Sequence, residues 1–199
     1  MIKAFLFDYD GVITKGVDNE WVAGRLARNL NVTIETTSAW MKDIWTEFLK
    51  GTISEKEVWK RIEEKYGKPI DRQQRNIWFM WDEVKPLPEM LKLVRSLKQD
   101  GYIVGVLSNV FSVTKDLVNA QSGYDAFDFV VASCDLGHKK PEPEIFQAAL
   151  EKLGSIKPEE TVFLDDREAN VEAARKIDMT GIHVSDHEDA IRDVKELIN

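Results

Sequence analysis

The stretch FLFDYDGV, residues 5–12, decides the fold, because an apolar run ends there in two acids and a glycine. Alternate residues of an extended segment point to the same side, so Asp8 and Asp10 can act on one substrate while Tyr9 points away. Two unpaired carboxylates this close repel each other, which raises the pKa of one of them, and they normally need a cation or a proton. The alternative is a strand that ends in an Asp-Gly turn without a ligand.

The same design, an apolar run followed by polar residues and a helix-like stretch, occurs three more times. The runs are residues 102–107, 127–132 and 161–164, and the polar residues after them are Ser108-Asn109, Gly137 to Pro141 beyond a loop, and Asp165-Asp166. Short apolar runs between helical stretches indicate a parallel sheet covered on both faces. Ligands bind at the carboxyl ends of the strands in such sheets, so we expect these residues to hold a phosphate and a divalent metal.

Strands and helices alternate after Pro88. We predict a helix that ends at Asp100, a last short strand over 181–184, and further helices over 112–121, 143–153, 168–177 and 187–198. The alternation predicts an α/β fold, a doubly wound, Rossmann-like parallel sheet of five or six strands.

A second, helical unit is predicted between residues 15 and 85, which contain all six tryptophans and no strand signal. A capping box at 54–57 opens a helix that runs to about Tyr66, and further helices are expected over 19–30, 37–50 and 71–83. We therefore predict a small helical bundle at 15–85, inserted into a core of residues 1–14 and 86–199. Its tryptophans either fill the bundle or, with Trp45 and Trp81 as first candidates, face the cleft.

Composition excludes some classes of function. The net charge is −8, from 27 basic and 35 acidic residues, which disfavours a nucleic-acid partner. No stretch approaches the ~20 apolar residues that a membrane span needs, so we expect no membrane partner. The single cysteine excludes an intrachain disulfide and fits a cytoplasmic location. Whether the protein is a monomer or a weak dimer stays open.

Taken in order, the four polar segments resemble the four motifs of the haloacid dehalogenase superfamily, and more narrowly its aspartate-nucleophile phosphatases with a helical cap. The matching stretches are DYDGV at 8–12, LSN at 107–109, GHKKPEP at 137–143 and FLDDREANVEAA at 163–174. The resemblance covers the chain up to about residue 14 and from about 86 to 186. It implies that the insert is a cap that closes over the active site.

The acids of the first and fourth motifs have the roles that phosphoryl transfer needs. Asp8 is the expected nucleophile, because a carboxylate can form a covalent phosphoryl-enzyme, and the resemblance implies that its other oxygen binds Mg²⁺. Asp10 is the expected general acid and base, with its backbone carbonyl on the metal. Asp165 and Asp166 are the remaining metal ligands, and which of them binds directly stays open. Alternatively, they are acids that favour a helix N-terminus.

The middle motifs supply groups for the phosphate. The Ser108 hydroxyl and the Asn109 backbone are expected to donate hydrogen bonds to phosphate oxygens, although Ser108 could instead cap a helix. Lys140, in the lysine position of the family, is expected to place a positive charge between phosphate and nucleophile. Lys139 is expected to be a solvated surface residue.

These observations predict a Mg²⁺-dependent hydrolase of small phosphate monoesters that acts through an aspartyl-phosphate, with a small phosphorylated metabolite as its partner. A phosphomutase that acts on a sugar phosphate is an alternative enzyme. A phospho-acceptor or binding module without turnover is the alternative from another class. Family members that remove halide from small acids lack the second acid, so Asp10 disfavours a 2-haloacid dehalogenase. The natural substrate stays open.

Overall fold

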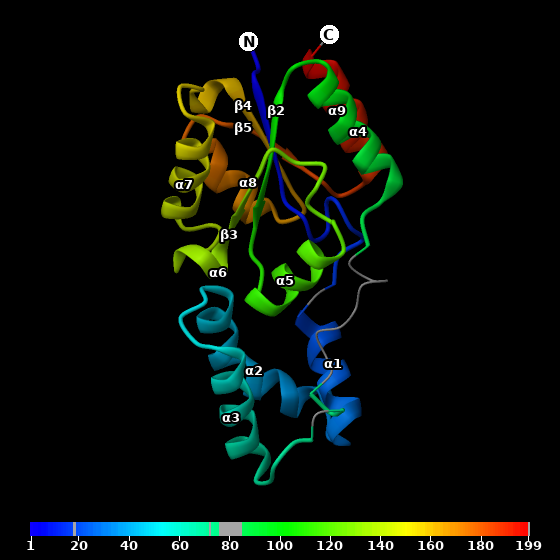
Figure 1. Cartoon of the computed structure of the whole chain (residues 1–199), viewed down its shortest axis with the longest axis vertical. Coiled ribbons are helices and arrows are strands. Elements are labelled where there is room, and N and C mark those ends of the chain that lie inside the picture. The colour runs from blue at the N-terminus through cyan, green and yellow to red at the C-terminus, as the bar shows by residue number, and fades with distance from the viewer. Residues whose placement is uncertain (18, 72, 76–84, 199) are drawn as a thin grey trace.

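The computed structural model describes all 199 residues except 18, 72, 76–84 and 199 (Figure 1). Its strands are β1 (Ala4–Phe7), β2 (Ile103–Ser108), β3 (Phe129–Ala132), β4 (Thr161–Asp165) and β5 (Thr180–His183). Its helices are α1 (Asn19–Leu30), α2 (Ile34–Leu49), α3 (Glu55–Tyr66), α4 (Pro88–Gln99), α5 (Ser112–Ala120), α6 (Ser133–Leu136), α7 (Pro143–Leu153), α8 (Glu168–Arg175) and α9 (His187–Ile198), with a 3₁₀ turn, η1 (Pro158–Glu160).

The strands form one parallel sheet in the order β3-β2-β1-β4-β5, which confirms the predicted fold class. β1 is central, and its last residue, Phe7, lies opposite Val106 of β2 and Leu164 of β4. The backbone N–H of Asp8 donates to the carbonyl of Leu164 at 2.8 Å, which extends this register by one residue. The residues that leave β1, β2 and β4 therefore emerge side by side at one edge of the sheet.

Helices cover both faces of the sheet (Figure 1). Alternation along β1 sends Phe5 and Phe7 to the face packed by α4 and α9, and Ala4 and Leu6 to the face packed by α7 and α8. β1 and β4 are buried on both faces, which is why they read as continuous apolar runs. Burial on both sides fixes the position of the strand ends that carry the polar residues.

Helices α1–α3 lie together beyond the carboxyl ends of the strands (Figure 1). The predictions for 19–30 and for the helix that ends at Tyr66 are confirmed, and α2 begins three residues earlier than predicted because Thr33 caps it. The helix predicted over 71–83 falls largely outside the described residues. We propose that residues 15–85 form the cap, and we call α1–α3 the cap helices.

The prediction for the segment that follows β3 was wrong. The segment after β3 is helix α6, not a loop, and Gly137 ends it with φ 75°. Four residues are too few to show a helical period in sequence. No helix among the described residues is long and apolar enough to cross a membrane.

Candidate active site

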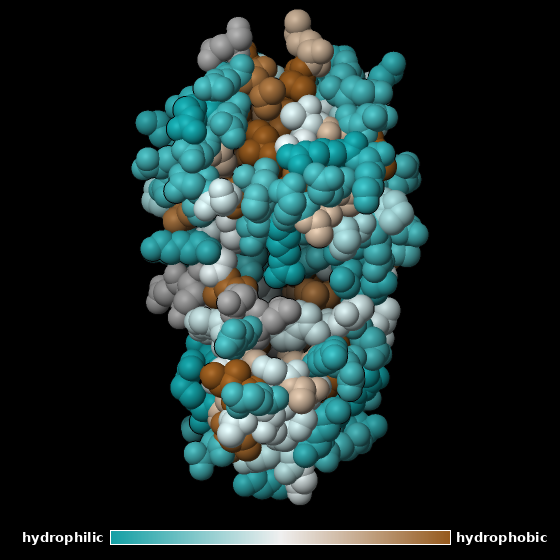
Figure 2. All heavy atoms as spheres, turned by 180° about the vertical axis from the view of Figure 1, so that it is seen from behind, coloured by the Kyte–Doolittle hydropathy of each residue, from teal (hydrophilic) through white to brown (hydrophobic). Residues whose placement is uncertain are grey.

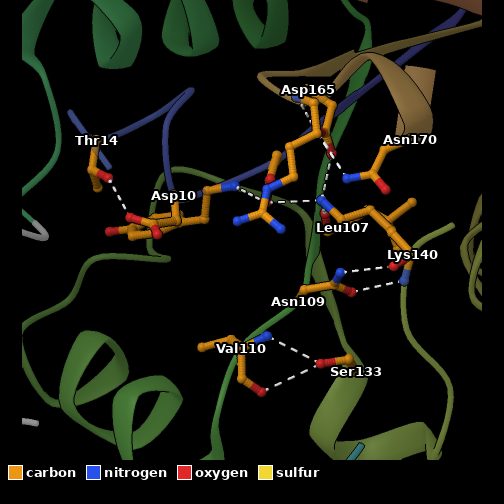
Figure 3. Close-up of polar contacts among 12 residues, drawn as sticks. Asp10, Thr14, Leu107, Asn109, Val110, Ser133, Lys140, Asp165 and Asn170 are labelled. Atoms are coloured by element: carbon orange, nitrogen blue, oxygen red, sulfur yellow. Dashed lines mark hydrogen bonds and ion pairs between the residues drawn. The ribbon is translucent and has the colours of Figure 1, made fainter. Parts of the chain in front are cut away.

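Lys140 lies at the centre of the polar cluster where β1, β2 and β4 end (Figure 3). Its side chain is fully buried, and its Nζ lies 2.7 Å from an oxygen of Asp165, 2.9 Å from Oδ1 of Asp8 and 2.7 Å from the carbonyl of Leu107. An ammonium group has three N–H donors, so these three oxygens use all of them. Lys140 therefore holds the two carboxylates in place and offsets part of their charge.

Asn109 fixes the backbone of Lys140, although the two residues are 31 positions apart. Its side-chain amide donates to the Lys140 carbonyl at 3.0 Å, and its side-chain oxygen accepts from the Lys140 N–H at 2.8 Å (Figure 3). The predicted contact of the Asn109 backbone with phosphate remains a prediction. This paired contact was missed in the sequence, because no local pattern links the second and third motifs.

The two acids of the fourth motif have different surroundings. Asp165 is fully buried, and its carboxylate accepts hydrogen bonds from Lys140, from the Arg167 N–H at 2.9 Å and from Asn170 Nδ2 at 2.9 Å. Protein donors thus occupy both of its oxygens. Asn170 was missed as a site residue, although it stands five positions after Asp165 inside the quoted motif.

Asp166 has a free oxygen. Its Oδ1 is buried and has no hydrogen-bond partner among the described residues. Gly11, with φ +89°, lies so close that a Cβ on it would stand 2.7 Å from the Asp166 carboxyl carbon. Only glycine lets the first-motif loop approach this carboxylate. A buried oxygen without a partner is expensive, so Asp166 points to a cation as its missing partner.

Three carboxylates lie close together at this edge of the sheet. Asp8, Asp165 and Asp166 each offer an oxygen, and these oxygens all lie within 4.8 Å of one another. Burial raises the pKa of Asp8 to about 8, although the nearby Lys140 ammonium lowers it. Burial, and then the charge of Asp165, also raises the pKa of Asp166. Three acids face one lysine here, so a divalent cation with a preference for oxygen ligands fits the cluster.

Asp10 is held where the chain leaves the core toward the cap helices. Its carboxylate accepts hydrogen bonds from the Thr14 hydroxyl at 3.2 Å (Figure 3) and from the Val17 N–H at 3.2 Å. Burial raises the pKa of Asp10, despite these hydrogen bonds, which lower it. A raised pKa keeps a larger protonated fraction near neutral pH, and a general acid needs that form. Thr14 was not identified as a site residue from the sequence.

A cavity of about 600 Å³ opens between these residues and the cap helices. Its wall contains six of the seven predicted site residues, namely Asp8, Asp10, Ser108, Asn109, Lys140 and Asp166. Asp165 stands behind them. The cavity is also lined by Trp45, one of the two tryptophans considered for the cleft, whereas Trp81 lies outside the described residues.

The family model of haloacid dehalogenase-like hydrolases matches residues 2–178. The chain belongs to this family. The match spans the core motifs and the helical insert together, so the expected resemblance is confirmed.

Relatives in this family include enzymes named as phosphatases. The sesquiterpene phosphatase astK of Aspergillus oryzae is 25% identical over 98% of this chain and 96% of its own length. The bifunctional epoxide hydrolase 2 of Rattus norvegicus is 35% identical over 54% of this chain, which spans only 20% of that enzyme's length. Another curated relative matches over only 11% of its length.

A solved structure of the same fold contains ligands. The HAD family enzyme bt-2542 of Bacteroides thetaiotaomicron, in complex with magnesium and inorganic phosphate, is 27% identical, with a TM-score of 0.77 over 92% of this chain and 94% of that chain. A magnesium complex of the same enzyme is 28% identical, with a TM-score of 0.80 over 96% of this chain and 98% of that chain.

Proposed function

We propose that the protein is a Mg²⁺-dependent phosphatase, which transfers the phosphoryl group of a small phosphate monoester first to Asp8 and then to water. The observation that carries this proposal is the Asp8 carboxylate, buried at the cavity floor between a lysine and an acid with an unpaired oxygen. The sesquiterpene phosphatase and the phosphate complex among the relatives support it.

In the first step, an oxygen of Asp8 attacks phosphorus and the bond between phosphorus and the ester oxygen breaks. Lys140 contacts Oδ1 of Asp8, which leaves Oδ2 as the attacking oxygen or as a metal ligand. Asp10 donates its proton to the departing alkoxide, which leaves as the neutral alcohol. The product is an aspartyl-phosphate on residue 8 and an ionised Asp10.

In the second step, water attacks the phosphorus of the aspartyl-phosphate. Asp10 takes a proton from this water, the bond between phosphorus and the Asp8 oxygen breaks, and inorganic phosphate leaves. Both catalytic acids return to their starting state. Ser108, buried at the end of β2 on the cavity wall, is placed to donate its hydroxyl to a phosphate oxygen in both steps.

Asp8 and Asp166 would hold Mg²⁺ through side-chain oxygens, with the Asp10 carbonyl as the third protein ligand. Asp165 is the weaker candidate for a direct ligand, because protein donors already bond both of its oxygens. When bound, Mg²⁺ neutralises charge on the phosphoryl oxygens and so lets an anionic nucleophile approach an anionic ester. The cytoplasmic location and the monomeric or weakly dimeric state remain predictions.

Hydrolysis of an aryl phosphate, measured by phosphate release with Mg²⁺ and with a chelator, tests the proposal. We expect multiple turnovers only with the metal, and loss of activity in Asp8→Asn. Asp193→Asn, the same change at an exposed position of α9, is the matched control and should keep full activity. Metal-independent turnover, or an active Asp8→Asn protein of native fold, would reject the proposal. A single turnover with phosphate retained on the protein would indicate a phospho-acceptor.

A further inference from the structure

The cavity has two unlike sides. Beyond the carboxylates and Lys140 at the sheet edge, much of its wall is apolar and comes from both halves of the molecule. The cap helices contribute Val22, Trp45 and Leu49, and the core contributes Val110, Phe111 and Val118. A phosphate group bound at Asp8 leaves this wall to the alcohol part of the ester. The wall is therefore the part of the site that distinguishes one phosphate ester from another.

Phe111 makes the aromatic part of this wall rigid. It precedes α5 of the core, yet it is 93% buried in the hydrophobic cluster of the cap helices. Its ring stacks on Phe48 at 4.6 Å and meets Trp45 edge to face at 4.7 Å. Both geometries are favourable for aromatic pairs. Trp45 is thus held in place, and the surface that it presents to the cavity is formed before any ligand binds.

The carboxyl end of α2 is fixed to the core in the same way, which positions Leu49. The buried Ser133 hydroxyl donates to the Leu49 carbonyl at 2.6 Å and also accepts from the Val110 N–H at 3.0 Å. Next to it, Lys50 forms an ion pair with Glu142 of the core at 2.7 Å. These contacts keep the apolar wall at a set position opposite the phosphate site.

Charged residues also line the cavity, but solvent reaches their side chains. Lys15 and Arg167 are exposed and Lys139 is partly exposed. An exposed cation stays hydrated and contributes little to binding a second anion. Trp45 and Leu49 are partly exposed and gain more from a ligand, because a ligand with an apolar surface removes their own surface from water.

Few large apolar side chains are strongly exposed on the described part of the chain. They are Met1, Ile34, Leu136 and Leu197. The face seen in Figure 2 is mostly hydrophilic, with one group of hydrophobic side chains near the top and a few others elsewhere. The enclosed apolar part of the cavity wall fits a small molecule bound inside it.

We infer that the substrate is the phosphate ester of an alcohol with a bulky, uncharged apolar body, and that Trp45, Leu49 and Phe111 select it. This inference rests on the proposed function and adds the class of leaving group. A cavity of about 600 Å³ accommodates an organic group of drug-like size. The energy of burying that group against the wall favours such esters over short or carboxylated ones.

A series of straight-chain alkyl phosphates, from ethyl to decyl, tests the inference. The acidity of the leaving alcohol hardly changes along the series, so kcat/KM reports the contact with the wall. We expect kcat/KM to rise by up to about fourfold per added methylene until the cavity is full. A terminal carboxylate on a chain of equal length should lower kcat/KM.

Two variants assign the selection to residues. Trp45→Ala and Leu49→Ala should flatten the rise, with long-chain esters losing roughly tenfold in kcat/KM and ethyl phosphate changing little. Trp40→Ala is the matched control, because Trp40 lies on the same helix, packs against Tyr66 and does not line the cavity. It should keep the wild-type slope.

The outcomes separate this inference from the proposed function. If the wild-type enzyme hydrolyses these esters with equal or falling kcat/KM as the chain grows, or prefers the carboxylated esters, the inference is overturned while the phosphatase stands. If no ester is hydrolysed, the proposed function fails. Binding of alkyl phosphonates to Asp8→Asn then decides the inference separately, since affinity must still rise with chain length. If Trp45→Ala does not fold, the inference is still tested by how kcat/KM of the wild type and the affinity of Asp8→Asn for phosphonates change with chain length.

Discussion

Asp165 and Asp166 are neighbours with the same side chain, yet the structure predicts opposite effects when each is replaced by asparagine. Asp165 accepts hydrogen bonds from Lys140, from the Arg167 N–H and from Asn170, and it is fully buried. In Asp165→Asn, an amide nitrogen replaces one oxygen and faces donors. Asp166 has a buried oxygen with no partner among the described residues, so Asp166→Asn breaks no hydrogen bond there.

The size of the effect follows from the buried ion pair. Removing one partner of a buried pair costs about 3–5 kcal/mol of unfolding free energy. Lys140 keeps its contact with Asp8 in Asp165→Asn, so we expect the lower end, about 3 kcal/mol. For a chain of this size, each kcal/mol lowers Tm by about 2–4 °C, which gives a loss of about 6–12 °C. In metal-free Asp166→Asn, Tm should stay equal or rise, because one of three crowded carboxylates loses its charge.

Thermal unfolding with a chelator, followed by titration with Mg²⁺, measures both predictions. Asp166→Asn should need at least ~10-fold more Mg²⁺ for half-maximal stabilisation and activity, since even residues behind the ligands cost 10–100-fold. An Asp165→Asn protein that melts within 2 °C of wild type, or an Asp166→Asn protein with the larger loss of Tm, would refute this division of roles.

Three further predictions concern other residues. Asp10→Asn should lower kcat by about 10²–10⁴-fold for alkyl phosphates, because their leaving groups need a proton. Release of the phenolate from an aryl phosphate should be much less affected. Burst kinetics would measure this release. The metal-free protein should lose stability as pH rises from about 4 to 8, because the raised pKa of Asp8, about 8 when folded against 3.8, makes the folded state bind more protons in this window. Asp8→Asn should remove that loss, so its gain in unfolding free energy over wild type, measured in denaturant, should grow with pH. Asp193→Asn should match wild type at each pH. A gain that shrinks with pH would contradict the assignment of the raised pKa to Asp8. Ser133→Ala should lower the unfolding free energy by about 1–3 kcal/mol, because the buried Val110 N–H loses its acceptor, and urea unfolding would measure this.

Most of the fold could be predicted from sequence because each strand is a short apolar run bounded by polar residues. The site could be predicted with it, because parallel strands bring their carboxyl ends to one edge, and so Asp8, Ser108 and Asp165 meet. Helices with clear caps, such as the one that Ser54 opens and Gly67 ends, were equally predictable. These features depend on a residue's own neighbours in the chain.

Features that depend on distant neighbours could not be predicted. Asp165 and Asp166 have the same side chain. Only the position of Lys140 and Gly11 in space gives one a hydrogen-bonded carboxylate and leaves the other with an unpaired oxygen. Phe111 lies in the segment predicted as core, and only the structure shows that it is buried among the cap helices. Helical periodicity orients side chains around a helix and does not tell which helix faces the cleft, so Trp45 was only a candidate.

Rapid acid quenching of the Asp10→Asn enzyme during turnover of an aryl phosphate tests the central claim most directly. This variant should still transfer the phosphoryl group to Asp8, because an aryl leaving group needs no proton, and should hydrolyse it slowly. Mass spectrometry of the digested protein should then find one phosphoryl group on the peptide that contains Asp8, and none in a protein that also carries Asp8→Asn. A phosphoryl group on another residue, or turnover without any covalent phosphoryl-enzyme, would contradict the account.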